Sequence, residues 1–301
     1  MKSFIFEALM QTILARNVTL RVLVAALVGY LVSGLEVVAE ETPAARPKRL
    51  LLLQQGPDGH AWASHEYHDG VRILAEILQR VPGLQVIVVD ADEPWSGGPE
   101  LLDGADGAFL YLAEGAKWLS RNPTRLAAFE KLAERKGGLV ALHWGIGTKT
   151  AEPVDNFVQL FGGCHGGPDR KYKIVNTSIK LRKEHPILRG VEPSEVEDEF
   201  YYRLKFPKTG PRITPLVDVE IDGASHTVGW AWERSGGGRS AGFSGGHYHR
   251  NWKLASYRRL VSQSILWSIG HEIPQKGIPV DVPEKSIELL RPKPAEKKPR
   301  M

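Results

Sequence analysis

The chain has 301 residues, 42% of them hydrophobic and 25% charged, which is the composition of an ordinary globular protein. Its formal net charge of +4 is carried by the two ends, because residues 1–39 and 291–301 hold an excess of basic side chains and leave the body between them nearly neutral. A nearly neutral body lacks the positive field that binds phosphate backbones, so nucleic acid is excluded as an expected partner. With Cys164 as the single cysteine, an internal disulfide is impossible.

Residues 1–39 have the order of a secretory signal. Basic residues are followed by the apolar run 22–32 and then by small residues at the positions that a signal peptidase reads, and the run is too short for a comfortable membrane span. We expect a signal peptide and a protein exported to the periplasm or cell envelope. An uncleaved N-terminal anchor is the alternative, and membrane contact is expected only in that case. Residues 40–47 follow as a linker.

From residue 48 the pattern alternates between short apolar runs and amphipathic stretches with helical spacing. The runs have the length of strands, and the stretches are bounded by Pro and Gly. Strands separated by helices imply βαβ units and a parallel sheet. The predicted strands are 49–54, 84–89, 107–112 and 139–143, and the predicted helices cover about 71–78, 123–136 and 155–161.

After residue 171 the pattern takes the two-residue period of antiparallel strands, and a closing helix follows at about 253–269. The predicted fold class is α/β: a flavodoxin-like doubly wound parallel sheet with an antiparallel extension, in one domain over 48–273. The Pro- and Lys-rich residues 274–301 lack the apolar content that would offset their ordering entropy, so we expect an extended, partly disordered tail. The predicted antiparallel strands are 172–181, 199–204, 227–232 and 239–243.

The first predicted strand runs into a loop rich in ionisable side chains. Residues 58–69 hold three histidines and three carboxylates, at the strand end where doubly wound sheets bind ligands. A polar loop that caps the next helix, with Asp69 as the cap, is the plainer interpretation. Three histidines exceed what capping needs, so His60 and His65 are candidates for ligands or substrate contacts.

His143 ends the fourth predicted strand and is followed by small residues, which predicts a tight strand-to-helix turn like a nucleophile elbow. The Gly145-Ile146-Gly147 run lacks the third glycine of a dinucleotide-binding loop at the required spacing. No nucleotide cofactor is therefore expected, and His143 is a candidate for the chemistry of the site.

Two further segments carry polar side chains beside aromatic ones. His247 and His249 would share one side of the chain in a strand but not in a turn, and a purely structural polar loop is the alternative. Asp198 and Glu199 precede Tyr201, a combination in which carboxylates accept hydroxyl protons while the ring stacks on a sugar. Aromatic residues at alternating positions are also typical of a core.

Five motifs occur in an order and spacing that resemble the ThuA-like (trehalose-utilisation) family over about residues 48–272. The resemblance implies a role in carbohydrate metabolism and the fold of class I glutamine amidotransferases. The motifs are Gly-Gly-x-x-x-x-His at 137–143, Phe-Gly-Gly-Cys-His at 161–165, Glu-His-Pro-Ile at 184–187, Asp-Glu-Phe-Tyr at 198–201 and the block from Trp230 to His247.

The resemblance does not extend to the amidotransferase reaction. Glutaminase chemistry needs a cysteine nucleophile at the elbow, where this chain has His143, and imidazole cannot replace that thiolate. Cys164 follows one block later, after a predicted helix, and is expected to be a small packing residue. We therefore expect no glutamine amidotransferase activity.

Two functions are consistent with these residues. The first is an enzyme, a hydrolase or isomerase acting on a sugar or keto-sugar derivative, in which His143 is the catalytic acid/base. The second is a non-catalytic carbohydrate-binding or scaffold module of the cell envelope. In both, a small carbohydrate is the expected partner, and the oligomeric state is left open. The residues expected to contact substrate are His60, His65, His165, Asp198, Glu199, His247 and His249.

A divalent metal is the one cofactor that these side chains suggest, because it would stabilise a developing oxyanion. Four scattered histidines, however, have no diagnostic ligand spacing. The whole interpretation depends on the fold gathering them into one pocket. The expected metal ligands are His60, His143, His165 and His247.

Overall fold

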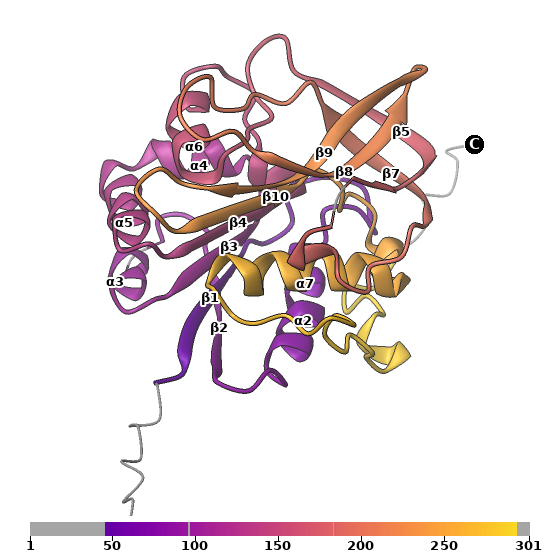
Figure 1. Cartoon of the computed structure of the whole chain (residues 1–301), viewed down its shortest axis with the longest axis horizontal. Coiled ribbons are helices and arrows are strands. Elements are labelled where there is room, and N and C mark those ends of the chain that lie inside the picture. The colour runs from indigo at the N-terminus through magenta and orange to yellow at the C-terminus, as the bar shows by residue number, and fades with distance from the viewer. Residues whose placement is uncertain (1–45, 96, 183, 294–301) are drawn as a thin grey trace, which may run out of the picture. The chain divides into compact units, whose positions relative to one another are not determined.

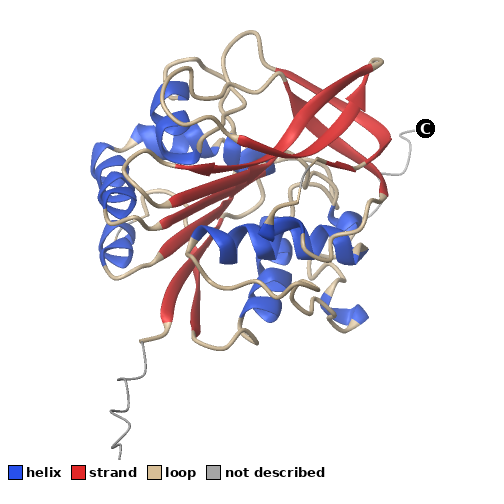
Figure 2. Ribbon diagram, in the orientation of Figure 1, coloured by secondary structure: helices blue, strands red, loops and turns tan. Residues whose placement is uncertain are grey.

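The computed structural model describes residues 46–293, apart from residues 96 and 183. Its central sheet has eight strands in the order β2-β1-β3-β4-β10-β9-β8-β6 (Figures 1 and 2). The first five of these run parallel, and their order is that of the flavodoxin-like fold. The predicted fold class is therefore confirmed. The parallel strands are β1 (Lys48–Gln54), β2 (Leu84–Asp90), β3 (Gly107–Tyr111), β4 (Gly138–Leu142) and β10 (Arg239–Phe243).

The leucine run of β1 shows why the sheet is buried on both faces. Successive strand residues point to opposite faces, so Leu50 and Leu52 enter one apolar cluster and Leu51 and Leu53 enter the other. All four side chains are at most 1% exposed. A continuous apolar run is what a parallel strand covered by helices on both sides requires.

Helices cover both faces of the sheet (Figure 1). The longest, α7, packs with α2 on one face, and four helices pack on the other, giving three layers. The bounds on the first face are α2 (Tyr67–Leu78) and α7 (Ala255–Ser268). Those on the second are α3 (Gly98–Asp103), α4 (Gly115–Arg121), α5 (Pro123–Glu134) and α6 (Val154–Phe161).

The antiparallel extension differs from its prediction in one strand. The segment 239–243 was expected to be antiparallel, yet β10 pairs parallel with β4 and antiparallel only with β9. It therefore closes the parallel part of the sheet and brings the residues after Phe243 beside the end of β4. A separate pair of strands, β5 and β7, lies outside the main sheet. The remaining strands are β5 (Lys171–Ser178), β6 (Lys180–Leu181), β7 (Glu195–Tyr202), β8 (Thr214–Ile221) and β9 (Ala224–Glu233).

The C-terminal segment is more ordered than the sequence indicates. Residues 274–293 were expected to belong to a partly disordered tail, but Ile278, Val280 and Ile287 are buried in the core cluster beneath α2 and α7. Three apolar side chains spread among prolines and charges were too few to be recognised as a packing motif. The predicted signal and most of the linker, together with residues 294–301, lie outside the described residues and stay predictions.

No helix within residues 46–293 is both long enough and apolar enough to span a membrane.

Candidate metal centre

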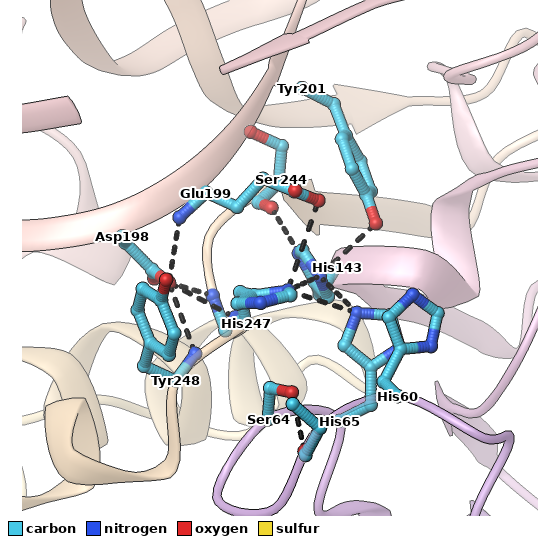
Figure 3. A network of polar contacts seen from close by, with 12 residues as sticks. His60, Ser64, His65, His143, Asp198, Glu199, Tyr201, Ser244, His247 and Tyr248 are labelled. Atoms are coloured by element: carbon cyan, nitrogen blue, oxygen red, sulfur yellow. Dashed lines mark hydrogen bonds and ion pairs between the residues drawn. The ribbon is translucent and has the colours of Figure 1, made fainter. Parts of the chain in front are cut away.

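Three histidines from distant parts of the sequence meet at the carboxyl edge of the parallel sheet (Figure 3). His65 lies in the loop after β1, His143 directly follows β4, and His247 follows β10. Nε2 of His65 is 3.0 Å from Nε2 of His143 and 3.0 Å from Nδ1 of His247. The third separation, between Nδ1 of His247 and Nε2 of His143, is 3.3 Å. The three rings therefore direct one nitrogen each at a common point.

The backbone holds two of these histidines in an unusual conformation. His143 begins a 3-10 turn (His143–Ile146) with a φ of 49°, and His65 has a φ of 53°. A left-handed backbone is costly for a residue other than Gly, and it persists where the surrounding structure fixes it, commonly at functional sites. The tight turn that the sequence predicts at His143 is therefore present, and it aims the imidazole across the sheet edge.

In two of these rings the other nitrogen, Nδ1, donates a hydrogen bond. Nδ1 of His143 is 2.8 Å from the carbonyl oxygen of Ser244, which can only accept, so this nitrogen carries the proton. Nδ1 of His65 is 2.7 Å from Oδ2 of Asp58. Although burial raises it, hydrogen bonds from His65, Tyr67 and His60 hold the pKa of Asp58 below its ordinary value, so that carboxylate also accepts. Both Nε2 atoms therefore bear lone pairs when the rings are neutral.

Burial keeps the rings neutral. It lowers the pKa of His143 and His65 and brings the pKa of His247 to about 3. Two lone pairs facing each other at 3.0 Å repel, and a cation or a proton between them would relieve that repulsion. Zinc binds histidine nitrogen at about 2.0–2.1 Å, which places two nitrogens of a tetrahedral site about 3.3 Å apart. The observed separations of 3.0–3.3 Å are close to that value.

A carboxylate completes the group. Oε1 of Glu199, on β7, is 3.8 Å from Nδ1 of His247, and the ligand atoms of Glu199 and the three histidines lie within 4.8 Å of one another. Burial raises the pKa of Glu199 to about 7, a shift that a bound cation would reverse. Three neutral imidazoles and one carboxylate are a ligand set that zinc and other first-row divalent metals accept.

His65 and His143, whose Nδ1 atoms are donors, also have the outer hydrogen-bond partner that histidine metal ligands usually have. Histidine ligands generally donate their other N–H to a carboxylate or a backbone carbonyl, which fixes the tautomer. Asp58 does this for His65, and the Ser244 carbonyl does it for His143. The register of β10 against β4 pairs Phe243 with Leu142, and this places Ser244 beside His143. The parallel pairing of β10 therefore builds part of the site.

Comparison with known protein families identifies the family of this chain. The family model described as trehalose utilisation, ThuA, matches residues 58–268. The chain belongs to the ThuA family. That family description supports a carbohydrate-related role for the chain. Among curated proteins, none matches it in sequence.

Solved structures with similar folds include a ThuA-like protein from Bacteroides uniformis, with 14% identity and a TM-score of 0.58 over 79% of this chain and 96% of that one. That likeness supports the fold alone. Two other solved structures are less similar to this chain. They are PurLQS from Thermotoga maritima (13% identity, TM-score 0.42, 74% and 97% covered) and the glutaminase domain of Trypanosoma brucei CTPS with bound acivicin (11%, 0.42, 77% and 98%).

Two of the four predicted metal ligands, His143 and His247, are in this group, where His65 and Glu199 join them although both had been expected to contact substrate. His60 and His165 lie outside it. His60 stacks on His65 with ring centroids 3.7 Å apart and bonds through Nδ1 to Asp58. Asp58, His60 and His65 form a second group that could hold a metal ion, and it shares His65 with the first.

His165 lies behind Tyr201. The Tyr201 ring stacks with His143 at 4.6 Å and with His165 at 4.0 Å between centroids. The Tyr201 hydroxyl is 3.1 Å from Nε2 of His143, and burial raises its pKa, so it keeps its proton. His165 thus supports Tyr201 by stacking instead of contributing a nitrogen to the centre.

Asp198 is a structural carboxylate in this arrangement. It is fully buried, and its oxygens accept from the Tyr257 hydroxyl and from backbone N–H groups of Glu199 and residues 246–248. Burial raises the pKa of Asp198, and these hydrogen bonds oppose that shift. The expected substrate contact is therefore not at Asp198, which instead holds the loop that carries His247.

His249 is directed away from the centre. Its Nε2 is 2.6 Å from the carbonyl oxygen of Ile287. The same C-terminal segment bonds the loop before α2, because Trp62 donates to the Arg291 carbonyl and the Arg291 guanidinium pairs with Glu66 at 2.6 Å. Residues 284–293, here named the C-terminal strap, therefore join the loop that carries His65 to the turn that carries His247.

Sequence reasoning missed the roles of Asp58, Tyr67, Tyr201 and Ser244. Asp58 stood in the acidic and histidine-rich loop, and a carboxylate near a candidate histidine is a detectable signal for an outer ligand partner. Ser244 could not have been found, because it acts through its backbone carbonyl. Cys164 is buried in the core and burial raises its pKa, in keeping with the packing role that we expected.

Proposed function

We propose that this protein is a metal-dependent enzyme that acts on a sugar or keto-sugar derivative. His65, His143, His247 and Glu199 would hold one divalent cation. The observation that carries the proposal is the 3.0 Å approach of two Nε2 atoms whose rings both donate through Nδ1. A divalent cation between them would turn that repulsion into attraction. Membership of the ThuA family supports the carbohydrate part.

When bound, such a cation supplies Lewis-acid polarisation of a sugar carbonyl or hydroxyl, or activation of a water. Side chains of the protein must then transfer the protons of the reaction. In this proposal both nitrogens of His143 are engaged, Nδ1 by Ser244 and Nε2 by the ligand group, so the acid/base role moves from His143 to another residue.

His60 is the residue that fits the acid/base role. Its side chain is 44% exposed, and Nδ1 is bonded at 2.7 Å to Asp58, which fixes the tautomer. Within the described residues its Nε2 makes no hydrogen bond and remains to exchange a proton with substrate. The Tyr201 hydroxyl is a second donor, placed to stabilise negative charge beside His143.

The test of this function combines metal analysis with turnover. We expect one equivalent of a divalent metal in the purified protein, and metal-dependent conversion of a member of a panel of glucosides, trehalose and their keto derivatives followed by NMR. His60→Gln should keep the metal and lose at least about 100-fold in kcat, because general acid–base catalysis contributes about 10²–10⁴-fold. Gln at this position keeps the size of the side chain without the titrating ring.

Two outcomes contradict the proposal. Failure of zinc, manganese, cobalt and nickel to bind would remove the metal centre. Saturable sugar binding by the metal-loaded protein without turnover on the panel would instead indicate the non-catalytic binding module.

Export is part of the proposal. It is supported by the order of basic, apolar and small residues in 1–39. N-terminal sequencing of the mature protein tests it: cleavage near residue 39 supports export, whereas an intact start recovered from the cytoplasm contradicts it.

A further inference from the structure

A cleft of about 240 Å³ opens beside the metal centre. Asp58 and His60 line it on one side, and Glu114, Lys117 and Lys149 line it on the other. Asp58 and His60 follow β1 and Glu114 and Lys117 follow β3, where the strand order of this fold reverses and ligands characteristically bind, and Lys149 lies in the loop after β4. The cleft therefore includes the proposed acid/base residue His60, whose ring stacks on the candidate ligand His65.

The position of Glu114 in this cleft is fixed by strain and close packing. Glu114 has a left-handed backbone with a φ of 44°, immediately before α4. The next residue is Gly115, where a Cβ would come within 2.0 Å of the Gly145 carbonyl oxygen. Only glycine permits this approach of α4 to the turn after His143. A strained non-glycine residue that carries a carboxylate into a cleft is typical of a binding site.

The ionic side chains across this wall have unused hydrogen-bonding capacity. Oε1 of Glu114 is 3.7 Å from Nζ of Lys117 and 3.7 Å from Nζ of Lys149. These separations suit ion pairs but are too long for hydrogen bonds, whereas Oε2 of Glu114 already accepts one from the Lys149 backbone N–H at 3.2 Å. By contrast, Gln55 on the same wall already bonds the Ala91 carbonyl and the Ala113 N–H. A ligand that offers both donors and acceptors would form hydrogen bonds with Oε1 of Glu114 and with the ammonium groups of Lys117 and Lys149.

The charge and the size of the cleft indicate the kind of ligand. Among the described residues that line it, three are acidic and three are basic, so there is no net field for an anion. A volume of about 240 Å³ lies below the ~300–1,000 Å³ of sites for drug-sized ligands. Trp144 adds an aromatic surface to the wall. The combination suits one neutral polyhydroxylated ring.

We infer that this cleft binds a single neutral sugar ring, with neighbouring hydroxyls on the Glu114 carboxylate and on the ammonium groups of Lys117 and Lys149. The ring then lies against Trp144 and presents its reacting carbon to His60 and the metal centre. This inference deepens the proposed function and rests on it for the chemistry, but ring binding itself needs no metal ligand.

The experiment measures binding of glucose and glucose 6-phosphate to the full-length, metal-loaded protein by tryptophan fluorescence and saturation-transfer NMR. Glucose should bind saturably, and Glu114→Gln and Lys149→Met should each weaken it at least about tenfold, because hydrogen bonds to charged groups are lost. Lys208→Met, in a different groove beside α6, is the matched control and should bind glucose like the unmodified chain.

The inference is overturned if glucose does not bind, if E114Q and K149M both bind it normally while thermal unfolding shows them folded, or if glucose 6-phosphate binds more than tenfold tighter than glucose. A parallel metal titration separates the two proposals. Loss of glucose binding in E114Q with full metal loading supports the cleft. Glutamate-dependent glucose binding in a chain that takes up no metal supports the cleft and refutes the metal centre.

Discussion

Two buried polar groups meet at β7, and they differ in how their hydrogen bonds are satisfied. Asp198 faces one side of the strand, and its two oxygens accept from five donors. Glu199 faces the other side and joins the three histidines, where acceptors point at acceptors. A saturated buried group stabilises the fold, whereas an unsatisfied one costs free energy and needs an explanation. In the proposed function, a divalent cation held by the histidines and Glu199 would supply that explanation.

The two groups are also connected through backbone hydrogen bonds. The donors that bind Asp198 include the backbone N–H groups of Gly246 and His247, so the saturated group positions a ligand of the unsaturated one. We therefore expect that breaking the Asp198 group damages the fold first and metal binding second. Breaking the histidine group should do the reverse.

The largest effect is expected at Asp198. In Asp198→Asn an amide NH₂ replaces one oxygen that accepts two hydrogen bonds, and losing two charge-assisted bonds should lower the free energy of unfolding by about 3–5 kcal/mol. Chemical denaturation of the metal-free protein measures this. Asp169→Asn, which removes an exposed partner of Lys205, is the control and should cost less than about 1 kcal/mol. Equal stability of the two variants would contradict the structural role.

His143→Gln should give the opposite pattern. Loss of a direct ligand should weaken metal binding by more than the ~10–100-fold that loss of an outer partner costs, with stability of the metal-free protein nearly unchanged or improved. Isothermal titration with zinc measures the affinity. His165→Gln is the matched control, because His165 also stacks on Tyr201 but supplies no ligand atom. If both variants bind zinc equally, the ligand assignment is wrong.

Asp58→Asn tests the outer partner of His65. The amide can turn its NH₂ toward Nδ1 and favour the wrong tautomer, so metal affinity should fall about 10–100-fold. The same titration measures it, and an unchanged affinity would argue against this tautomer assignment. Metal affinity should fall less here than in H143Q, because the ligand itself remains.

The last effect is gradual and concerns pH. Burial lowers the pKa of His165 to about 3, whereas the unfolded chain titrates near 6.5. Above pH 6.5 both states are neutral and this residue adds no pH dependence. Below it the unfolded state binds the proton first, so stability should fall by about 1.4 kcal/mol per pH unit until the folded pKa is approached. Denaturation of metal-free protein between pH 7 and 4 should show a flatter profile for H165Q than for the unmodified chain, and identical slopes would refute the shift.

The sequence carried enough information for the sheet and for its functional edge. Four consecutive leucines between polar residues define β1, and Pro123 and Gly137 bound the region of α5. His143 could be placed at a strand end from its neighbours alone. These features depend on residues that are close in the chain.

The choice of ligands depends on contacts between distant residues, and the sequence could not supply it. His65 and His143 meet because β1 and β4 flank β3, and His247 joins them because β10 pairs parallel with β4. The two-residue alternation of 239–243 is the same for a parallel and an antiparallel partner. Glu199 reaches the group through β7, which pairs only with β5 and whose placement no local pattern specifies.

The C-terminal strap has a consequence for the order of assembly. His65, His143 and His247 are synthesised before the segment that secures their loops, because His249 bonds the Ile287 carbonyl and Glu66 pairs with Arg291. Domains tend to fold from the N-terminus as the chain emerges. The strap contacts form only once residues 284–293 have been made, so under the proposed function the loops that carry the ligands would be secured after all the ligands themselves are in place.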